Sequence, residues 1–505
     1  MPDMDLAGKE GLASDDLLCV VDQWLPILYH TFPSRDIDIQ DLSSEHIARI
    51  FFLLENGEVN EVAKKEALSF CFYQLRNDAQ SKRFKHAVLI GSLPKFMLES
   101  KLQYILRNLL EAILFDSCGE AYDSKLRKSA IKAIEKIVRK CPVDGDCDGI
   151  TAINNDIVRF LFDGLMKAMT DYSSNSRGDV GYIVREAAMS GIEFLLTHIS
   201  RQDPSLIKRD DWKLFIGSLL QQTAEKMDRT RAHAGAIFIR LIHSEVSDTK
   251  KIPGLKVFQK LFPKNFPDFF RRGRSADIFS RLIKILPMKE YTYPVLSGIV
   301  VSSGGYVSES MCNHARRSLL NYLRESASEN IEQFEDFLNT LTTIYKNNGR
   351  TDRIVFPLLC MTDFLLLNDS FSLIMDNDCH PFLLGVMDML EVESVTSTDV
   401  IKTEVIISAT CAMMEFPDKI RKRSIPLIIK YLMNKYPKVR CYAADQLYIA
   451  LMTFEKSLQN YQIDRLMELL ADTVWEDSLS TLRTVIEQIC HGFNLSANHL
   501  LLLEE

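Results

Sequence analysis

Five segments of the chain align with one another when one arginine of each is placed in register, and this internal repeat limits the fold more than any other feature. The register arginines are Arg83, Arg127, Arg185, Arg231 and Arg440. Small residues dominate the third and fourth positions after the arginine, and the seventh and tenth positions are apolar in every segment. These positions share one face of a helix, and small side chains let a neighbouring helix approach closely. The repeat therefore predicts helices that stack on one another.

The spacing of the arginines indicates the kind of repeat. The first four lie roughly 44 to 58 residues apart, and the last interval of about 209 residues is close to five units of the roughly 40 to 47 residues typical of HEAT or armadillo repeats. A degenerate copy is expected near Asn313–Leu320. We predict an all-α fold, an α-solenoid of HEAT/armadillo-type helical repeats. Each arginine segment should be the second helix of an antiparallel pair and should pack parallel to its counterpart in the next repeat.

Length and composition agree with a repeat array. At 505 residues the chain is too long for one hydrophobic core, and its 21 Gly and 16 Pro leave long stretches without a turn signal. Apolar residues recur at spacings of three and four, as from Leu102 to Leu114. We expect residues 1–80 to form an N-terminal helical segment with an incomplete start, 81–260 to form repeats with a clear arginine register, and 261–505 to form degenerate repeats.

A second aligned position lies six residues before each register arginine. The residues there are Asn77, Ala121, Asp179, Glu225 and Asn434, so four of the five offer a side-chain oxygen. An arginine donor and such an acceptor can bond between adjacent repeats, as in HEAT proteins. For any single arginine, an exposed charge at a helix end is the competing interpretation. We predict a repeat-stacking ladder made of Asn77, Arg83, Arg127, Asp179, Arg185, Glu225, Arg231, Asn434 and Arg440.

The charge balance argues against two classes of partner. The chain has 60 Lys and Arg against 68 Asp and Glu, a formal net charge of -8, and the signs are interleaved. Binding to bulk nucleic acid or to an anionic membrane is therefore not indicated. The most apolar stretch, Phe356–Leu367, is too short to span a bilayer and contains Asp363. The eleven scattered Cys, with no signal-peptide pattern after Met1, lead us to expect reduced thiols in the cytoplasm.

Several short motifs were compared with sites of known chemistry. Asp144–Gly149 matches the first half of a calcium-binding EF-hand loop, but the twelfth position is Asn155, which cannot supply the bidentate carboxylate. Cys141 and Cys147 lack a second pair of zinc ligands. Gly304–Gly305 lacks the residues of a phosphate-binding loop. We expect no metal, no cofactor and no catalytic residue in this chain, and we interpret it as a binding protein rather than an enzyme.

One local cluster combines basic and aromatic side chains. It is the candidate partner surface for an acidic protein, and an ordinary solvated loop is its alternative. Its residues are Phe269, Phe270, Arg271, Arg272 and Arg274.

The segment Asp171–Met189 reads DYSSNSRGDVGYIVREAAM and resembles the tubulin-folding cofactor D family. Similar segments follow in the same order as in the family, among them Lys260–Pro263, Tyr293–Gly305, Tyr436–Arg440 and Leu470–Trp475. The chain has Ile183 where the family usually has Trp and Asn313 where it usually has Arg. Because members of the family are longer, the chain is similar to their C-terminal half.

The resemblance implies a cofactor that binds β-tubulin and helps to assemble or disassemble the α/β-tubulin heterodimer. Its implied partners are tubulin-folding cofactors E and C and an Arf-like small GTPase, and any stimulation of GTP hydrolysis is expected to act on a partner, tubulin or the small GTPase. The implied location is the cytoplasm, with association at microtubules or centrosomes. A HEAT-repeat scaffold or transport adaptor for other proteins is the alternative function, and an enzyme would need a cleft with convergent polar groups. The ordered match from Asp171 to Trp475 favours the tubulin cofactor.

Overall fold

The computed structural model describes most of the chain beyond residue 71. The described residues are 72–73, 75–76, 80–93, 95–98, 101–114, 123–147, 152–176, 178–264, 275–304, 307–375, 377 and 379–495. They pack as two units. The first unit contains the described residues up to 219 together with 232–264, and the second contains 220–231 together with the described residues from 275 to 495.

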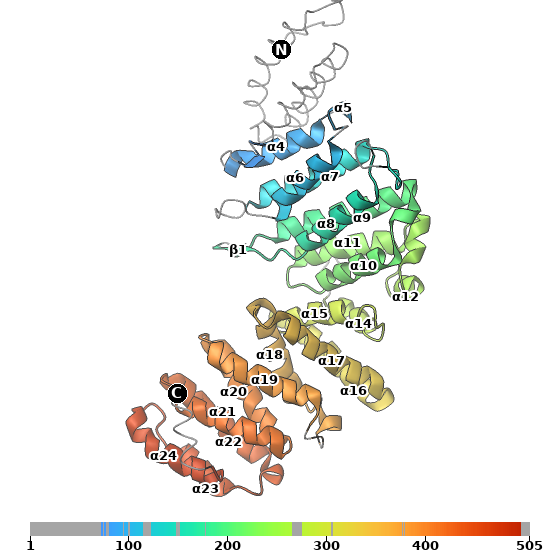
Figure 1. Cartoon of the computed structure of the whole chain (residues 1–505). Coiled ribbons are helices and arrows are strands. Elements are labelled where there is room, and N and C mark those ends of the chain that lie inside the picture. Colours follow the sequence, from blue (N-terminus) through green and yellow to red (C-terminus); the bar gives the residue numbers. More distant parts are fainter. Residues whose placement is uncertain are drawn as a thin grey trace, which may run out of the picture. The chain divides into compact units, whose positions relative to one another are not determined.

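Helices form nearly all of the first unit (Figure 1). Its elements in chain order are α4 (Gln80–Ser92), α5 (Lys95–Leu98), α6 (Leu102–Leu114), α7 (Ser124–Lys140), α8 (Asn155–Ala168), β1 (Ser174–Asn175), β2 (Gly178–Asp179), α9 (Tyr182–Gln202), the 3₁₀ helix η2 (Pro204–Leu206), α10 (Arg209–Thr223), α11 (Asp228–Ile242), η3 (Ser247–Lys251) and α12 (Leu255–Leu261). The end of α10 and the first turn of α11 belong to the second unit. The strands β1 and β2 form an antiparallel hairpin, the only named strands among the described residues.

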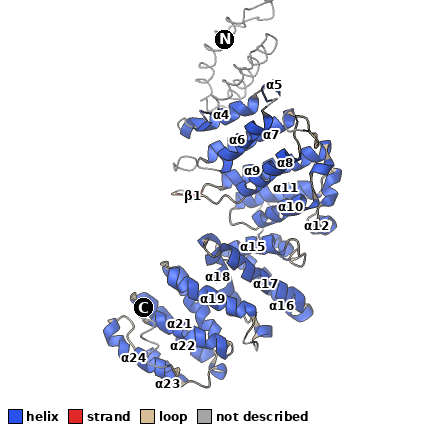
Figure 2. Ribbon diagram, in the orientation of Figure 1, coloured by secondary structure: helices blue, strands red, loops and turns tan. Residues whose placement is uncertain are grey.

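The second unit is helical throughout its described part, as the colouring of Figure 2 shows. Its further elements are α14 (Ser275–Ile283), α15 (Thr292–Ser303), α16 (Glu309–Glu329), α17 (Ile331–Asn348), α18 (Asp352–Leu366), η4 (Ser372–Ile374), α19 (Pro381–Thr396), α20 (Val400–Ala412), η5 (Met413–Glu415), α21 (Asp418–Leu432), α22 (Pro437–Thr453), η6 (Glu455–Ser457), α23 (Ile463–Asp472) and α24 (Leu479–Gly492).

The helices of each unit stack in pairs. In the first unit α6 pairs with α7 and α8 with α9, while α4, α7 and α9 pack in succession as one layer and α6 packs on α8 in the other. In the second unit α17–α18, α19–α20, α21–α22 and α23–α24 are pairs, and α15, α18, α20 and α22 pack in succession. Three register arginines lie in the second helix of such a pair, namely Arg127 in α7, Arg185 in α9 and Arg440 in α22. The prediction of an all-α solenoid of HEAT-type repeats is confirmed.

The residues of the stacking face are buried, as the register predicts. The third position after each arginine is at most 5% exposed, and so are the seventh and tenth positions. Glycines in the same layer let the helices approach closely. A Cβ on Gly91 would lie 2.7 Å from the Cα of Ala133, so α4 and α7 are almost in backbone contact there. A larger residue at Gly91 would push the two helices apart.

The breaks between helices follow from their capping residues. The Asp123 carboxylate accepts the backbone N–H groups of Lys125 and Leu126 at 3.1 and 2.9 Å and so starts α7. The Asn154 side chain starts α8 in the same way, by accepting the N–H of Ile157 at 3.0 Å. At the end of α15, a Cβ on Gly304 would lie 2.8 Å from the Pro357 carbonyl oxygen, so this glycine allows α15 to reach α18.

Within the described part of the chain, no helix combines the length and apolar character that a membrane crossing requires. The buried segment around Phe356–Leu367 forms most of α18, which packs between α15 and α20.

Candidate functional site

The most deeply buried of the register arginines is Arg185, in the first turn of α9. Its side chain is 0% exposed, and its Nη1 and Nη2 donate to the two carboxylate oxygens of Asp179 at 3.2 and 2.7 Å. Nη1 also donates to the Asp171 carbonyl at 2.6 Å, and the guanidinium lies 4.3 Å from the centre of the Tyr172 ring. Arg185 therefore fastens both ends of the β1–β2 hairpin to the start of α9.

The local backbone explains why the hairpin forms here. Gly178 has φ +108°, a conformation that residues with a Cβ avoid. The N–H groups of Val180 and Gly181 both donate to the Ser173 carbonyl at 3.0 Å, which closes the base of the hairpin. A Cβ on Gly181 would collide with the Asp171 carbonyl oxygen. Two glycines therefore permit the close turns of this loop, and one buried arginine bonds it to α9.

Arg185 and Asp179 differ from the expected ladder in one respect. Both belong to the same repeat, so their bond braces one inter-helix loop instead of joining neighbouring repeats. Arg127 does join neighbours, because its Nη1 donates to the Asp171 carboxylate at 2.9 Å across to the loop after α8. Asp171 was not among the predicted ladder residues.

Arg231 and Arg440 each donate a hydrogen bond to the backbone carbonyl of the residue six positions before them. Nη1 of Arg231 donates to the Glu225 carbonyl at 2.8 Å, and Nη1 of Arg440 donates to the Asn434 carbonyl at 2.8 Å. At these two arginines the structure therefore shows backbone acceptors, where the sequence analysis expected the Glu225 and Asn434 side chains. A carbonyl is present whatever the residue type, which explains why the residue type at this position varies.

The remaining predicted ladder residues are placed as follows. Arg83 is 5% exposed, in α4, while Asn77 lies outside the described residues. The Glu225 carboxylate instead pairs with Arg353 of α18 at 3.0 Å, and the Asn434 side chain accepts the backbone N–H of Tyr436 at 2.9 Å. The stacking role of the set as a whole stays a prediction.

The degenerate copy near Asn313–Leu320 lies within α16. Its arginine is Arg316, whose Nε donates to the Ser303 carbonyl at the end of α15 at 2.6 Å.

The candidate partner surface cannot be placed in the structure. Phe269, Phe270, Arg271, Arg272 and Arg274 lie outside the described residues, so their role stays a prediction.

The acidic loop after α7 is bonded as a turn. The Asp144 carboxylate accepts the N–H of Asp146 at 3.1 Å, and the backbone of Val143 pairs with that of Ile153. Asn155, at the twelfth position of the calcium-loop pattern, is the first residue of α8. In the part of the chain that the structure describes, no three His, Cys, Asp or Glu side chains are grouped as metal ligands.

Asp248 in η3 holds a buried polar cluster that the sequence analysis missed. Its carboxylate accepts the Ser200 hydroxyl at 2.8 Å and the Trp212 indole N–H at 3.1 Å, and it pairs with Lys251 at 2.6 Å. The cluster joins the end of α9, the start of α10 and η3. Lys251 further donates to two carbonyls of the loop between α9 and α10, at Pro204 and Ile207.

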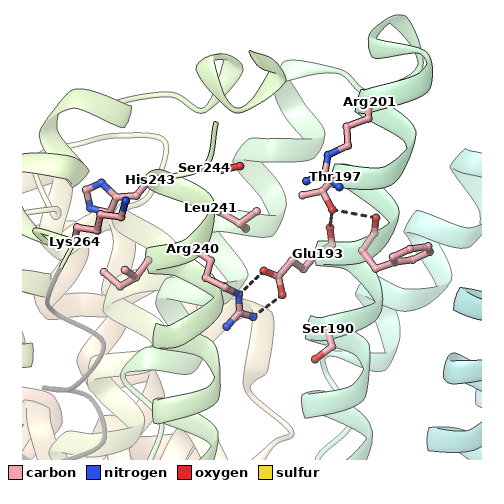
Figure 3. Close-up of a pocket in the computed structure, with 11 residues that line it drawn as sticks. Ser190, Glu193, Thr197, Arg201, Arg240, Leu241, His243, Ser244 and Lys264 are labelled. Carbon is pink, nitrogen blue, oxygen red and sulfur yellow. Dashed lines mark hydrogen bonds and ion pairs between the residues drawn. The ribbon is translucent and has the colours of Figure 1, made fainter. Parts of the chain in front are cut away.

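A groove of about 560 Å³ runs between α9 and α11 in the first unit (Figure 3). Its middle is bridged by Arg240 of α11, whose Nε and Nη2 donate to the two carboxylate oxygens of Glu193 of α9 at 2.8 and 2.6 Å. Arg201, on α9, and Lys264, beside His243, also line the groove, and both are exposed (Figure 3). This groove is a described surface feature that could hold a ligand or a segment of a partner.

A buried carboxyl in the second unit gives a prediction about pH. Burial between α18 and α20 raises the pKa of Asp363 from 3.8 to about 6, and the Ser408 hydroxyl and the charge of Arg316 only partly oppose this. The Oδ1 atom of Asp363 has no hydrogen-bond partner in the described structure. The folded chain therefore holds this proton more tightly than the unfolded chain, so ionisation destabilises the fold as the pH rises from about 4 through 6.

We expect Asp363→Asn to raise the free energy of unfolding by about 1 to 3 kcal/mol at pH 7.5, because the amide cannot ionise. The gain should shrink as the pH falls to 5 and the wild-type carboxyl takes up its proton. Urea midpoints of the two proteins at pH 7.5 and 5.0 measure the difference. An equal difference at both pH values would contradict the raised pKa.

Known proteins that are similar to this chain match different shares of it. Residues 213–402 match the family described as tubulin folding cofactor D C terminal. The tubulin-specific chaperone D of Dictyostelium discoideum is 24% identical over 462 residues, which cover 84% of this chain and 31% of the relative. The crystal structure of Kap121p is 12% identical, with a TM-score of 0.31 over 95% of this chain and 57% of that one.

The family match spans the helices from α10 to the start of α20. The chain spans about a third of the length of the curated relative. The resemblance found in the sequence is thereby confirmed: residues 213–402 are similar to the C-terminal region of the tubulin folding cofactor D family, and most of the chain is similar to the tubulin-specific chaperone D of Dictyostelium discoideum.

Proposed function

We propose that this chain is a protein-binding module of a tubulin-folding cofactor. In this role it binds β-tubulin and helps to assemble or take apart the α/β-tubulin heterodimer. The observation that carries the proposal is the family match over residues 213–402, supported by the named relative that aligns with most of the chain. Stacked helix pairs suit the role, because they offer a large continuous surface to a folded partner.

The proposed mechanism is binding without chemistry in this chain. In the described residues the charged groups of the register are engaged in structural bonds, as Arg185 is with Asp179 and Arg440 is with the Trp475 and Asp477 carbonyls at 2.9 and 2.7 Å. Stimulation of GTP hydrolysis would therefore act by positioning tubulin or an Arf-like small GTPase. Tubulin-folding cofactors E and C are the further proposed partners, and the cytoplasm, at microtubules or centrosomes, is the proposed location.

Binding of purified tubulin tests the proposal. The chain at 10 µM is mixed with tubulin heterodimer at about 1 µM and separated by size-exclusion chromatography, with the subunits identified by mass spectrometry. We expect β-tubulin to elute with the chain in a larger complex and α-tubulin to be released from part of the heterodimer. Serum albumin, which is also acidic, is the control for attraction by charge alone. Absence of β-tubulin from the complex, or equal retention of albumin, would overturn the proposal.

A further inference from the structure

The groove between α9 and α11 has an excess of positive charge. Arg201, Arg240 and Lys264 line it, against one carboxylate, that of Glu193. Glu193 already takes two hydrogen bonds from Arg240. Within the described residues neither Arg201 nor Lys264 forms an ion pair, and both side chains are exposed. This local excess contrasts with the net charge of -8 of the whole chain.

The bonding of Arg240 leaves room for a second acceptor. Its guanidinium uses Nε and one N–H of Nη2 on Glu193, so the N–H groups of Nη1 remain directed away from that carboxylate. The Arg240 side chain is 56% exposed. An incoming carboxylate can therefore bind the outer edge of Arg240 without breaking the bridge across the groove.

Phe194 of α9 lines the groove and is packed against groups that lie outside it. The Phe194 ring lines the groove, and the guanidinium of Arg139 from α7 lies 4.7 Å from the centre of that ring. His198, one turn further along α9, stacks on the Phe194 ring, and the two ring centres are 4.9 Å apart. Burial lowers the pKa of His198, and the charges of Arg139 and Arg201 lower it further. The amide of Gln202 lies 2.8 Å from Nε2 of His198 and donates to it, as it can to a neutral imidazole.

The length of the groove indicates an extended chain. The lining residues of α9 run from Ser190 to Arg201, which corresponds to about 16 Å along a helix. An extended peptide rises about 3.3 Å per residue, so about five residues would fill the groove. Figure 3 shows Lys264 beside His243 and Arg201 at the far end of α9, with the Arg240–Glu193 bridge between that end and Ser190.

We propose that the α9–α11 groove binds a short, extended, acidic segment of a partner protein, whose carboxylates pair with Arg201, Lys264 and the outer edge of Arg240. Charge complementarity selects this occupant, because the groove offers unpaired cations and its one carboxylate is already bonded. The lining has one phenyl ring, that of Phe194 on α9, and one imidazole, that of His243 just after α11, and the two form no row of platforms for stacked bases; this disfavours single-stranded nucleic acid. The inference does not depend on the proposed function, since it concerns only the charge and shape of the first unit.

Fluorescence anisotropy of three labelled probes tests the inference on the full chain. The probes are an eight-residue peptide rich in Glu, the same peptide with Gln at each Glu, and an eight-nucleotide thymidine strand. We expect the Glu peptide alone to bind, with affinity falling about tenfold between 50 and 300 mM salt, since exposed ion pairs are screened. Stronger binding of the thymidine strand, or binding of the Gln peptide equal to that of the Glu peptide, would overturn the proposal.

A pair of double variants separates the groove from general attraction. Arg201→Glu with Lys264→Glu should weaken binding of the Glu peptide at least tenfold. The matched control is Arg324→Glu with Lys346→Glu, which makes the same change in net charge at two exposed positions of the second unit and should leave binding unchanged. Because all four side chains are exposed, the variants should keep the helix content of the wild type, as circular dichroism can show. Equal loss in both double variants would overturn the groove as the site.

Discussion

Arg185→Ala should destabilise the repeat formed by α8 and α9 by about 3 to 5 kcal/mol, the range for removing one partner of a buried ion pair. The substitution leaves the Asp179 carboxylate and the Asp171 carbonyl without their shared donor, and it removes the guanidinium from the Tyr172 ring. The side chain of Arg185 is 0% exposed and that of Asp179 is 19% exposed, so the pair is largely shielded from water. Hydrogen exchange should become faster in the β1–β2 hairpin and the first turns of α9, with no partner present.

Arg240→Ala is the matched control for this substitution. It removes an arginine of α11 that also bonds a carboxylate through two nitrogens, but its side chain is 56% exposed. An exposed pair of this kind contributes about 0 to 1 kcal/mol. Exchange in distant helices such as α20 should not change in either variant, because repeats contact only their neighbours. If Arg185→Ala left exchange unchanged but abolished tubulin binding, Arg185 would belong to a binding surface and its structural assignment would be wrong.

The stacking layer could be predicted from sequence because its residues repeat. Ala130 and Ala188 each follow a register arginine by three residues, and both are 0% exposed in the structure. When every repeat makes the same contact, the same kind of residue recurs at the same position of each repeat. A single sequence then shows the pattern several times. The acceptors of Arg231 and Arg440 left no such trace, because a backbone carbonyl places no demand on the residue type.

The candidate groove could not be predicted for the opposite reason. Glu193 and Arg240 are 47 positions apart in the chain, and their pairing occurs once. Nothing in the sequence distinguishes Arg240 from other helical arginines until α9 and α11 are placed side by side. The same holds for Glu225 and Arg353, which are 128 positions apart and pair across the second unit. A contact that occurs once can be predicted only if the stacking order of the helices is known. The repeated arginines indicate that order only for the helices that contain one.

The polar cluster of Asp248 connects the stability of the first unit to the groove. Ser200, which donates to Asp248, immediately precedes Arg201 on α9. Trp212, which is 0% exposed, brings α10 to the same carboxylate. The cluster therefore fixes the end of the helix that carries one of the cations proposed to bind an acidic segment. Loss of the cluster should affect the fold first and the proposed binding as a consequence.

Asp248→Ala should lower the stability of this part of the first unit by about 3 to 5 kcal/mol, because it leaves a buried indole N–H and a buried hydroxyl without their acceptor and Lys251 without its counter-charge. The matched control is Asp210→Ala, which removes an aspartate of the same region that is 77% exposed and pairs only with Lys213. That change should cost about 0 to 1 kcal/mol. Hydrogen exchange should become faster at the end of α9 and the start of α10 in Asp248→Ala alone, and the emission of Trp212 should shift to longer wavelength as the indole meets water. Wild-type rates of hydrogen exchange in both variants would contradict this prediction. The Asp248 carboxylate would then contribute no more to stability than an exposed carboxylate, and the buried cluster would not be what holds α9, α10 and η3 together.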